Sequence, residues 1–384
     1  MKPQASSPED AIRSRHDGRL PFIHGLRGIA ALSVLAFHFF GFTPLEHQVG
    51  KALPVLLHSI MRFGFVGVDI FFIISGFVIA LTLYGRVRSF RQWGLFFVRR
   101  QLRLDPPYWV AIALSIVSAI LVNKIKPAIG ASTPSLTEVL AHLLYLEDIL
   151  GIKEIVGVFW TLCLEVQFYL VYGGLVLVFS RFKASAGMFA WSMLPLYATS
   201  LACFLGLLPT PRGLFIDRWF EFFTGVQLFL LWRKATSPMH MSMYLTMLVA
   251  AFLASLRQPS DDVNHIQVTL IAEFLLSALF MLAISRQGFQ RWLAHPLFVY
   301  FGSISYSLYL MHAVVGVRFL HVFVHPTDSP IFVWAAIVLG FILTLAASDL
   351  MYRFVEKPSI QLSQKFKERH RTGPSVTSLR LDAT

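Results

Sequence analysis

Arg27 and His38 place two ionisable side chains on the first apolar segment, PFIHGLRGIAALSVLAFHFFGF. They are eleven positions apart, and because a helix turns by about 100° per residue, both project from one helix face. At about 1.5 Å per residue, they lie about 16 Å apart along the axis. An ionisable side chain inside a bilayer is costly and by default indicates a functional site. We therefore expect Arg27 at a membrane edge and His38 well inside the membrane.

Three other apolar segments each carry a candidate ionisable residue, namely Asp69, Glu165 and His312. Counted from the predicted span ends, the two carboxylates lie about 10 Å below the external edge. His38 and His312 lie about 20 Å above the cytoplasmic edge. In a hydrocarbon core about 30 Å thick, all four fall near one level, which would suit a proton-handling site. The alternative for each residue is an ordinary role in packing or in bracing a helix.

Arg99, Arg100 and Arg103 form a cationic cluster just before Asp105-Pro106-Pro107, where we expect the third span to begin. Arg27 lies at the same membrane edge. Guanidinium groups bind phosphates through paired hydrogen bonds, so these four arginines could hold a phosphorylated substrate. The competing interpretation is the general excess of positive charge on the cytoplasmic side, together with binding to anionic lipid headgroups. The residues themselves leave both interpretations open.

The composition is typical of an integral membrane protein. Of 384 residues, 56% are hydrophobic and 14% are charged. Soluble proteins contain about 25% charged residues. Because about 20 apolar residues cross a bilayer, we predict an all-α, polytopic membrane protein with about ten transmembrane helices. The predicted spans are 23–42, 62–83, 106–122, 159–179, 186–207, 216–232, 241–256, 267–285, 297–320 and 331–351.

The distribution of Lys and Arg predicts the orientation. With a cytoplasmic N-terminus, 24 of the 33 fall on cytoplasmic segments and 9 on the other side, so we expect both termini to be cytoplasmic. The net charge of +12 is then a topology signal and does not indicate nucleic-acid binding. We divide the chain into a polar tail (1–20), a membrane domain (21–360) and a second polar tail (361–384). The first tail is unlike a cleavable signal peptide, and 363–384 is expected to be disordered.

Two segments between the spans stand out. Segment 84–105 is predicted to be a cytoplasmic loop rich in arginine and aromatic residues. Segment 123–158 is the longest external loop, in which Ser135 and Glu138 form a capping-box pattern ahead of LTEVLAHLLYLEDIL. That stretch is too short to span, so we expect an amphipathic helix over the external face.

Polar residues at helical spacing form a stripe on each of the last two spans. The first stripe consists of Ser305, Tyr309 and His312. The second consists of Asp349, Arg353 and Glu356. We interpret the second stripe as a structural ladder of ion pairs at the cytoplasmic end.

Cys163 and Cys203 are the two cysteines of the chain, and both lie in apolar runs. This count supports neither a disulfide framework nor a zinc site. We interpret both as small buried hydrophobic residues and expect no metal.

Five sequence blocks, in this order, resemble the signature blocks of the bacterial acyltransferase 3 family, membrane O-acyltransferases that modify surface sugars. The blocks are RGIAALSVLAFHFF, GFVGVDIFFIISGFVIA, FFVRRQLRLDPPYW, FWTLCLEVQFYL and FGSISYSLYLMH. The resemblance covers residues from about 20 to 360. It implies ten core helices in the bacterial inner membrane and an acyl-CoA donor, usually acetyl-CoA, on the cytoplasmic side. It also implies a carbohydrate or glycolipid acceptor that arrives from outside.

The resemblance further implies roles for particular residues: Arg27, His38, Arg99, Arg100, Arg103, Glu165 and His312. This chain departs from the family in two ways. Many members have Glu-Glu-Gln-Phe-Tyr where this chain reads EVQFY from Glu165, so a role that needs paired carboxylates is not expected here. Many also continue into a periplasmic hydrolase-like domain, whereas this sequence ends at Thr384. We therefore expect it to act alone or with a separate periplasmic partner.

We hypothesise that the four arginines hold the phosphates of coenzyme A, whose pantetheine arm reaches from Arg27 toward His38. His38 then takes the proton of the acceptor hydroxyl as a general base. Glu165 or Asp69 would orient His38 and stabilise its charged form, and His312 would serve the donor thiol. In a variant of this scheme, His38 itself carries the acyl group. The sequence does not separate the two schemes.

A proton-coupled secondary transporter is the main alternative, because intramembrane histidines and carboxylates also serve proton relays. The arginine cluster on one face and the lack of a clear internal repeat disfavour it. A non-catalytic membrane scaffold is the third alternative. The acceptor stays open among O-antigen, exopolysaccharide, peptidoglycan, a lipid-linked precursor and a secreted glycosylated metabolite.

Overall fold

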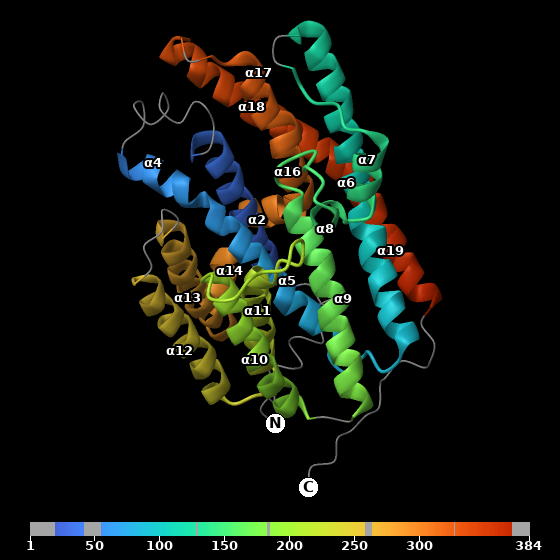
Figure 1. Ribbon diagram of the computed structural model, residues 1–384, viewed down its shortest axis with the longest axis vertical. Helices are drawn as coiled ribbons and strands as arrows, with labels where there is room; N and C mark the ends of the chain where they lie inside the picture. Colours follow the sequence, from blue (N-terminus) through green and yellow to red (C-terminus); the bar gives the residue numbers. More distant parts are fainter. Residues whose placement is uncertain are drawn as a thin grey trace, which may run out of the picture.

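Long apolar helices pack side by side in the computed structural model (Figure 1). In the part of the chain that the structure describes, nine helices are long and apolar enough to cross a membrane. This confirms the expected all-α, polytopic class. The structure describes residues 20–41, 55–127, 130–182, 185–257, 263–325 and 327–370.

The predicted span 216–232 forms a short 3₁₀ turn followed by helix α11 (Trp219–Trp232). With 14 residues, α11 is about 21 Å long, shorter than a hydrocarbon core of about 30 Å. Most of its side chains are buried, because it lies against α5 (Val66–Leu83) and α10 (Ala186–Phe204). It is therefore an internal helix of the bundle.

The predicted loop 84–105 is wrong, because helix α6 runs without a break from Phe90 to Ile125. Its first turn is capped by Ser89, whose hydroxyl accepts a hydrogen bond from the Gln92 N–H at 3.3 Å. Pro106 and Pro107 lie inside the helix. Proline usually ends a helix in water. In a membrane bundle it is tolerated, because neighbouring helices satisfy the backbone groups that proline leaves without a hydrogen bond. Here the Tyr306 hydroxyl donates to the Leu104 carbonyl at 2.8 Å and supports the preceding turn.

The last two predicted spans are longer and less regular than expected. The first is divided into several short helices with a π-helical turn, His312–Val317. The second continues through another π-helical turn, Tyr352–Glu356, into α19. Residues 363–369 are therefore helical, and the expected disorder is wrong for them, while 371–384 lie outside the described residues. The helices here are α15 (Pro296–Ser303), α16 (Ser305–Met311), α17 (Arg318–Phe323), α18 (Pro330–Met351) and α19 (Lys357–Arg369).

The loop before α9, which the sequence predicts to be external, contains the predicted capping box. The Glu138 N–H donates to the Ser135 hydroxyl at 3.3 Å, and the Ser135 N–H donates to the Glu138 carboxylate at 2.6 Å. The predicted single amphipathic helix is wrong, because the chain turns at Tyr145, whose φ is +57°. Two short helices result, α7 (Leu136–Leu143) and α8 (Glu147–Leu150).

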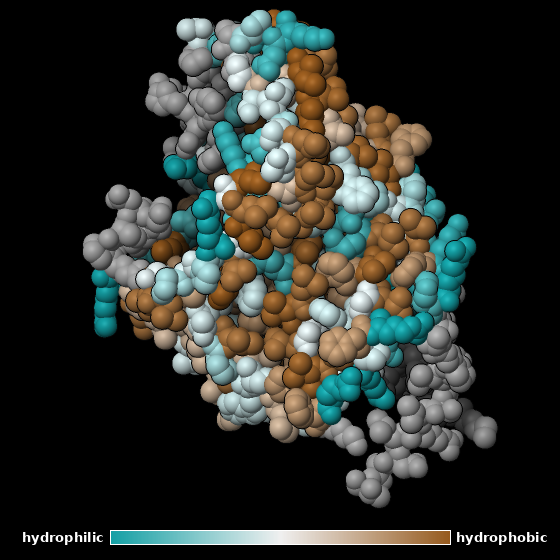
Figure 2. All heavy atoms as spheres, turned by 45° about the vertical axis from the view of Figure 1, so that its right-hand side comes forward, coloured by the Kyte–Doolittle hydropathy of each residue, from teal (hydrophilic) through white to brown (hydrophobic). Residues whose placement is uncertain are grey.

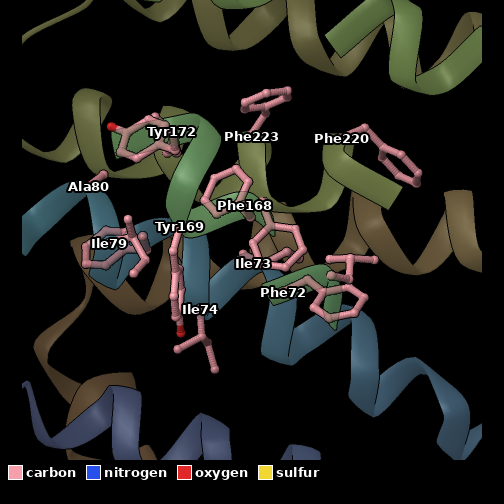
Figure 3. Packing of buried hydrophobic residues seen from close by; sticks show 14 of the residues in the cluster. Phe72, Ile73, Ile74, Ile79, Ala80, Phe168, Tyr169, Tyr172, Phe220 and Phe223 are labelled. Carbon is pink, nitrogen blue, oxygen red and sulfur yellow. The ribbon is translucent and has the colours of Figure 1, made fainter. Parts of the chain in front are cut away.

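Helices α5 and α11 approach each other very closely. A Cβ on Gly76 would lie 2.0 Å from the Phe222 carbonyl oxygen, and one on Gly225 would lie 2.0 Å from the Ile73 carbonyl oxygen. Aromatic rings fill the space beside this contact. The Phe222 ring stacks on Phe168 of α9, with centroids 4.3 Å apart. Figure 3 shows other aromatic side chains of the buried cluster around Phe168, among them Phe72, Tyr172 and Phe223. The remaining long elements are α2 (Pro21–Ala36), α4 (Val55–Arg62), α9 (Trp160–Arg181), α12 (Pro238–Ser255), α13 (Val263–Ser285) and α14 (Gln287–Leu293).

Apolar side chains cover the outside of the bundle. On α6, Trp109, Val117 and Leu121 are about half exposed, and Ile342 on α18 is 55% exposed. Figure 2 shows hydrophobic side chains gathered across the middle of one face, with hydrophilic ones near its margins. Such a surface would be unstable in water and fits the acyl chains of a bilayer.

The α5–α11 contact predicts the effect of a single methyl group. Gly76→Ala should lower the free energy of unfolding by about 1–3 kcal/mol, because the new Cβ collides with the backbone of α11. Thermal unfolding in detergent would show this as a lower Tm. Gly94→Ala on α6 is the matched control, since nothing lies within 4 Å of a Cβ at that position. An unchanged Tm for Gly76→Ala would contradict the packing described here.

Candidate active site

Helices α2, α5, α6, α9 and α16 enclose a cavity with about 780 Å³ of empty space, including its part open to solvent. Three guanidinium groups line it, from Arg27, Arg100 and Arg103, and we call it the arginine cavity. Glu165 also lines it. Arg99, which the sequence groups with these arginines, is not part of the lining. Because Arg99 and Arg100 are neighbours on α6, the helix directs them to different sides.

Two of the cavity arginines, Arg27 and Arg100, are held by a neighbouring helix. The Arg27 Nε donates to the Ser305 hydroxyl at 3.1 Å, which joins α2 to α16. The Arg100 guanidinium lies 5.3 Å from the centre of the Tyr169 ring and 5.6 Å from that of Phe96. These distances fit cation–π contacts, which hold a guanidinium in place while leaving its N–H groups able to bind an anion.

Two carboxylates lie among the arginines. Glu165 accepts hydrogen bonds from Tyr169 and, at 2.8 Å, from Ser75. Glu356 accepts two from Ser307, one from its N–H at 3.1 Å and one from its hydroxyl at 2.6 Å. Both carboxylates are close enough to act electrostatically on Arg27.

With every group ionised, three guanidiniums face two carboxylates, and one positive charge is left over. A buried, uncompensated charge is costly, and an anion that enters the cavity removes that cost. The arrangement therefore favours an anionic ligand. Glu356 was interpreted from the sequence as part of an ion-pair ladder, but only Asp349 and Arg353 pair as expected, at 2.7 Å. Glu356 instead lies close enough to Arg27 and Arg103 to act on them electrostatically.

His38 and His312 form a second cluster. The Nε2 of His312 lies 3.2 Å from the Nδ1 of His38, and His312 is almost completely buried. The expectation that Arg27 and His38 project from one helix face is confirmed, because both contact the same neighbouring segment. Arg27 bonds to Ser305, and His38 meets His312, which lies about two helical turns after Ser305.

Carbonyl groups next to the histidines define their tautomers. The Nδ1 of His312 lies 3.3 Å from the Leu308 carbonyl oxygen, and the Nδ1 of His38 lies 3.0 Å from that of Val34. A carbonyl oxygen only accepts hydrogen bonds, so we assign a proton to Nδ1 in both neutral rings. The single Nδ1–H of His38 is then shared between the Val34 carbonyl oxygen and the Nε2 of His312, and both accept. This leaves the lone pair of His38 on its Nε2, the nitrogen that can act as a base.

Tyr309 lies between the arginine cavity and the histidines. It lines the cavity, and its ring centre is 5.5 Å from that of His312, whereas neither histidine is part of the lining. Its hydroxyl shares a hydrogen bond with that of Thr161 at 2.9 Å and donates to the Val158 carbonyl at 3.2 Å. The passage that the sequence predicts from the arginines to His38 is thus interrupted at Tyr309 in this structure.

The π-helical turns of the described chain all carry candidate site residues. His38 lies in the turn Phe37–Gly41, His312 begins a second, and Glu356 ends a third. A π-helical turn costs energy compared with an α-helical one and often occurs at functional sites. The added residue also rotates the side chains that follow it, so these turns set where His38, His312 and Glu356 point.

Asp69 lies elsewhere. It is buried, and its charged neighbours are Glu221 and Arg218, which pair with each other at 3.2 Å. The sequence predicts two imidazoles and two carboxylates at one depth, but the structure places these four groups in three separate parts of the bundle. The two histidines meet, Glu165 joins the arginines, and Asp69 joins the α5–α11 contact. The sequence offers one signal for the true partner of Glu165, because Tyr169 follows it at i+4 spacing.

Known proteins provide an independent comparison. A model of the acyltransferase family, described as an acyltransferase domain, matches residues 20–353. The chain is similar to YrhL of Bacillus subtilis, provisionally named a peptidoglycan O-acetyltransferase, with 26% identity over 90% of this chain and 56% of that protein. It is also similar to the peptidoglycan O-acetyltransferase OatA of Listeria monocytogenes, with 30% identity over 42% of this chain and 25% of OatA.

A Staphylococcus aureus protein, provisionally named an O-acetyltransferase, is 24% identical over 88% of this chain and 57% of its own length. The chain thus spans little more than half the length of its Bacillus and Staphylococcus relatives. No solved structure matches it. The family match covers most of the chain and includes the arginine cavity residues Arg27, Arg100 and Arg103 and both histidines of the pair. This chain therefore belongs to the acyltransferase family that its five sequence blocks resemble.

Proposed function

We propose that this protein transfers an acyl group, usually acetyl, from acyl-CoA on the cytoplasmic side to a hydroxyl of a cell-surface or lipid-linked carbohydrate. It would work in the bacterial inner membrane. The observation that carries the proposal is the arginine cavity, which has an excess of positive charge. One of its lining residues, Tyr309, lies next to the pair of histidines. Family membership favours acyl transfer over the proton-coupled transporter.

The donor site follows from the charges. Arg27, Arg100 and Arg103 bind phosphate groups of coenzyme A, because planar guanidiniums pair well with phosphate oxygens. Glu165 and Glu356 act electrostatically on Arg27 and keep the cavity close to neutral. The 16 Å between Arg27 and His38 is about the reach of a pantetheine arm along the helix axis. The thioester then arrives near Tyr309.

The acyl transfer itself takes place at the histidines. The Nε2 of His38 removes the proton of the acceptor hydroxyl, whose oxygen attacks the thioester carbonyl. The carbon–sulfur bond breaks, and the leaving thiolate of coenzyme A takes up the proton that His38 removed, which returns His38 to its neutral form. His312 supports the imidazolium of His38 by accepting its Nδ1–H, the role that the sequence suggested for Glu165 or Asp69. A transient acyl group on His38 is the open variant.

Tyr309 must move for the donor and His38 to meet. Its bond to Thr161 and its contact with the Val158 carbonyl close the inner end of the arginine cavity. We propose that the arriving thioester displaces the Tyr309 ring. Closure in the absence of donor would keep water from an open path between the two sides of the membrane.

Peptidoglycan is the acceptor that the names of two relatives suggest, and we include it as the first candidate. This chain spans little more than half the length of one of them and a quarter of the other. We also include in the proposal a separate periplasmic partner that passes the group to the final acceptor. Mass spectrometry of cell-surface glycans with and without the gene would identify the acceptor by a lost acyl mass.

His38→Ala should lower acyl transfer from labelled donor by about a hundredfold or more, because a general base contributes about 10²–10⁴ to the rate. Membrane insertion and Tm should stay close to wild type. His321→Ala, an exposed histidine of α17, is the control and should keep full activity. Wild-type turnover by a folded His38→Ala variant would end the proposal for this residue.

Arg100→Ala should raise the KM for the donor by about tenfold or more, because a charged hydrogen bond to phosphate is lost. The KM for the acceptor should not change. The neighbouring Arg99, outside the cavity lining, provides a matched variant with the same loss of charge. Equal effects of Arg99→Ala and Arg100→Ala, or poor insertion as the only defect, would instead indicate a topological role for both arginines.

A further inference from the structure

Three potential metal ligands meet where α8 lies against the start of α9. Glu147 and Asp148 begin α8, and Cys163 lies in the first turn of α9. One oxygen of each carboxylate and the sulfur of Cys163 all lie within 4.8 Å of one another. The Sγ of Cys163 is 2.8 Å from Oε1 of Glu147, and both residues are at most 1% exposed. We call these three residues the carboxylate–thiol cluster.

Two oxygens of the cluster are buried without a hydrogen-bond partner, Oε2 of Glu147 and Oδ2 of Asp148. Leaving a buried carboxylate oxygen unpaired costs about 1–3 kcal/mol or more. The other oxygen of Glu147 is used, because it accepts from Cys163 and weakly, at 3.5 Å, from Tyr108. Two buried carboxylate oxygens thus have no hydrogen-bond donor beside them.

Negative charge also accumulates around the cluster. Glu154 is a further acidic neighbour, close enough for the charges of Asp148 and Glu147 to act on it. Among the described residues, no lysine or arginine forms an ion pair with any of these acids.

His142 does not supply the missing positive charge. Its Nδ1 lies 2.7 Å from the Glu138 carbonyl oxygen, and its Nε2 lies 3.0 Å from the Ile155 N–H. One nitrogen therefore donates and the other accepts, which is the pattern of a neutral imidazole with both nitrogens in use. His142 is neither a cation nor an available ligand. Either a proton on a carboxylate or a cation from solution would remove this excess negative charge.

We propose that the carboxylate–thiol cluster binds one divalent metal ion of the zinc type, through the thiolate of Cys163 and one oxygen each from Glu147 and Asp148. Thiolate selects zinc over magnesium or calcium, and a mixed set of one sulfur and two oxygens suits a metal of intermediate softness. In a tetrahedral zinc site, with bonds of about 2.0–2.3 Å, ligand atoms lie about 3–4 Å apart, so small side-chain rotations complete the site. Water or Glu154 would occupy the fourth position.

The sequence favoured reading Cys163 as a buried hydrophobic residue without a metal. The cluster revises that reading for one cysteine, because the ligands come from separate segments with no zinc-motif spacing between them. The metal would fasten α8 to α9 and, through Tyr108, to α6. It would also fix the segment between its ligands, which includes Val158, the residue whose carbonyl accepts from Tyr309.

Cobalt(II) provides the test, because cobalt bound to a thiolate absorbs in the near ultraviolet, which other cobalt sites do not. The full-length protein in detergent is stripped with chelator and titrated with cobalt. We expect one cobalt per chain, the thiolate band, and loss of the band when zinc is added. Cys203→Ser, which removes the other buried cysteine, should keep the band, and Cys163→Ser should abolish it.

Two carboxylate variants make the test independent of the cysteine. Glu147→Gln and Asp148→Asn keep the thiol and should weaken cobalt binding by about tenfold or more. Zinc should raise the Tm of the wild type and of Cys203→Ser but not that of Cys163→Ser. A wild type without the band, or a band that persists in Cys163→Ser, would overturn the site. None of these readouts involves acyl transfer, so the result is separate from the fate of the proposed function.

Discussion

The constraint on which the site depends is electrostatic. Three guanidinium groups are held inside a membrane bundle, where every uncompensated charge is costly. Glu165 and Glu356 reduce the excess to a single positive charge, and Ser75, Tyr169 and Ser307 hold those carboxylates in place. The cavity is therefore stable when empty and becomes more so when an anion enters. An electrostatic balance of this kind can select a phosphorylated donor without any large movement of the helices.

One segment of the backbone connects the arginine cavity to the pair of histidines. Helix α16 contacts Arg27 at its first residue and leads directly into the π-helical turn that begins at His312. Tyr309 lies between them on the same segment. One short stretch of chain thus touches the proposed donor site, the closed inner end of the cavity and the proposed base. A ligand that displaces Tyr309 would act on both sites through a rigid element rather than through a flexible loop.

The close α5–α11 contact explains why some polar residues are not in this site. Glycines at that contact bring two backbones together, and Asp69 is drawn into the same region, with Arg218 and Glu221 as its charged neighbours. Asp69, a carboxylate at the depth expected for the site, therefore lies at the α5–α11 contact instead. Depth along a helix defines only one coordinate, and the direction of the side chain around the axis decides which residues meet.

The sequence by itself determined the membrane class, most of the spans and the shared face of Arg27 and His38, because apolar length and helical period are local properties of the chain. It also identified the family through blocks that stay together in order. Only the tertiary structure decided that His312 meets His38, that Glu356 joins the arginines and that α6 continues through its two prolines. These outcomes depend on helix packing and on π-helical turns, each of which rotates the later side chains by about 100°, a shift that no regular spacing in the sequence reveals.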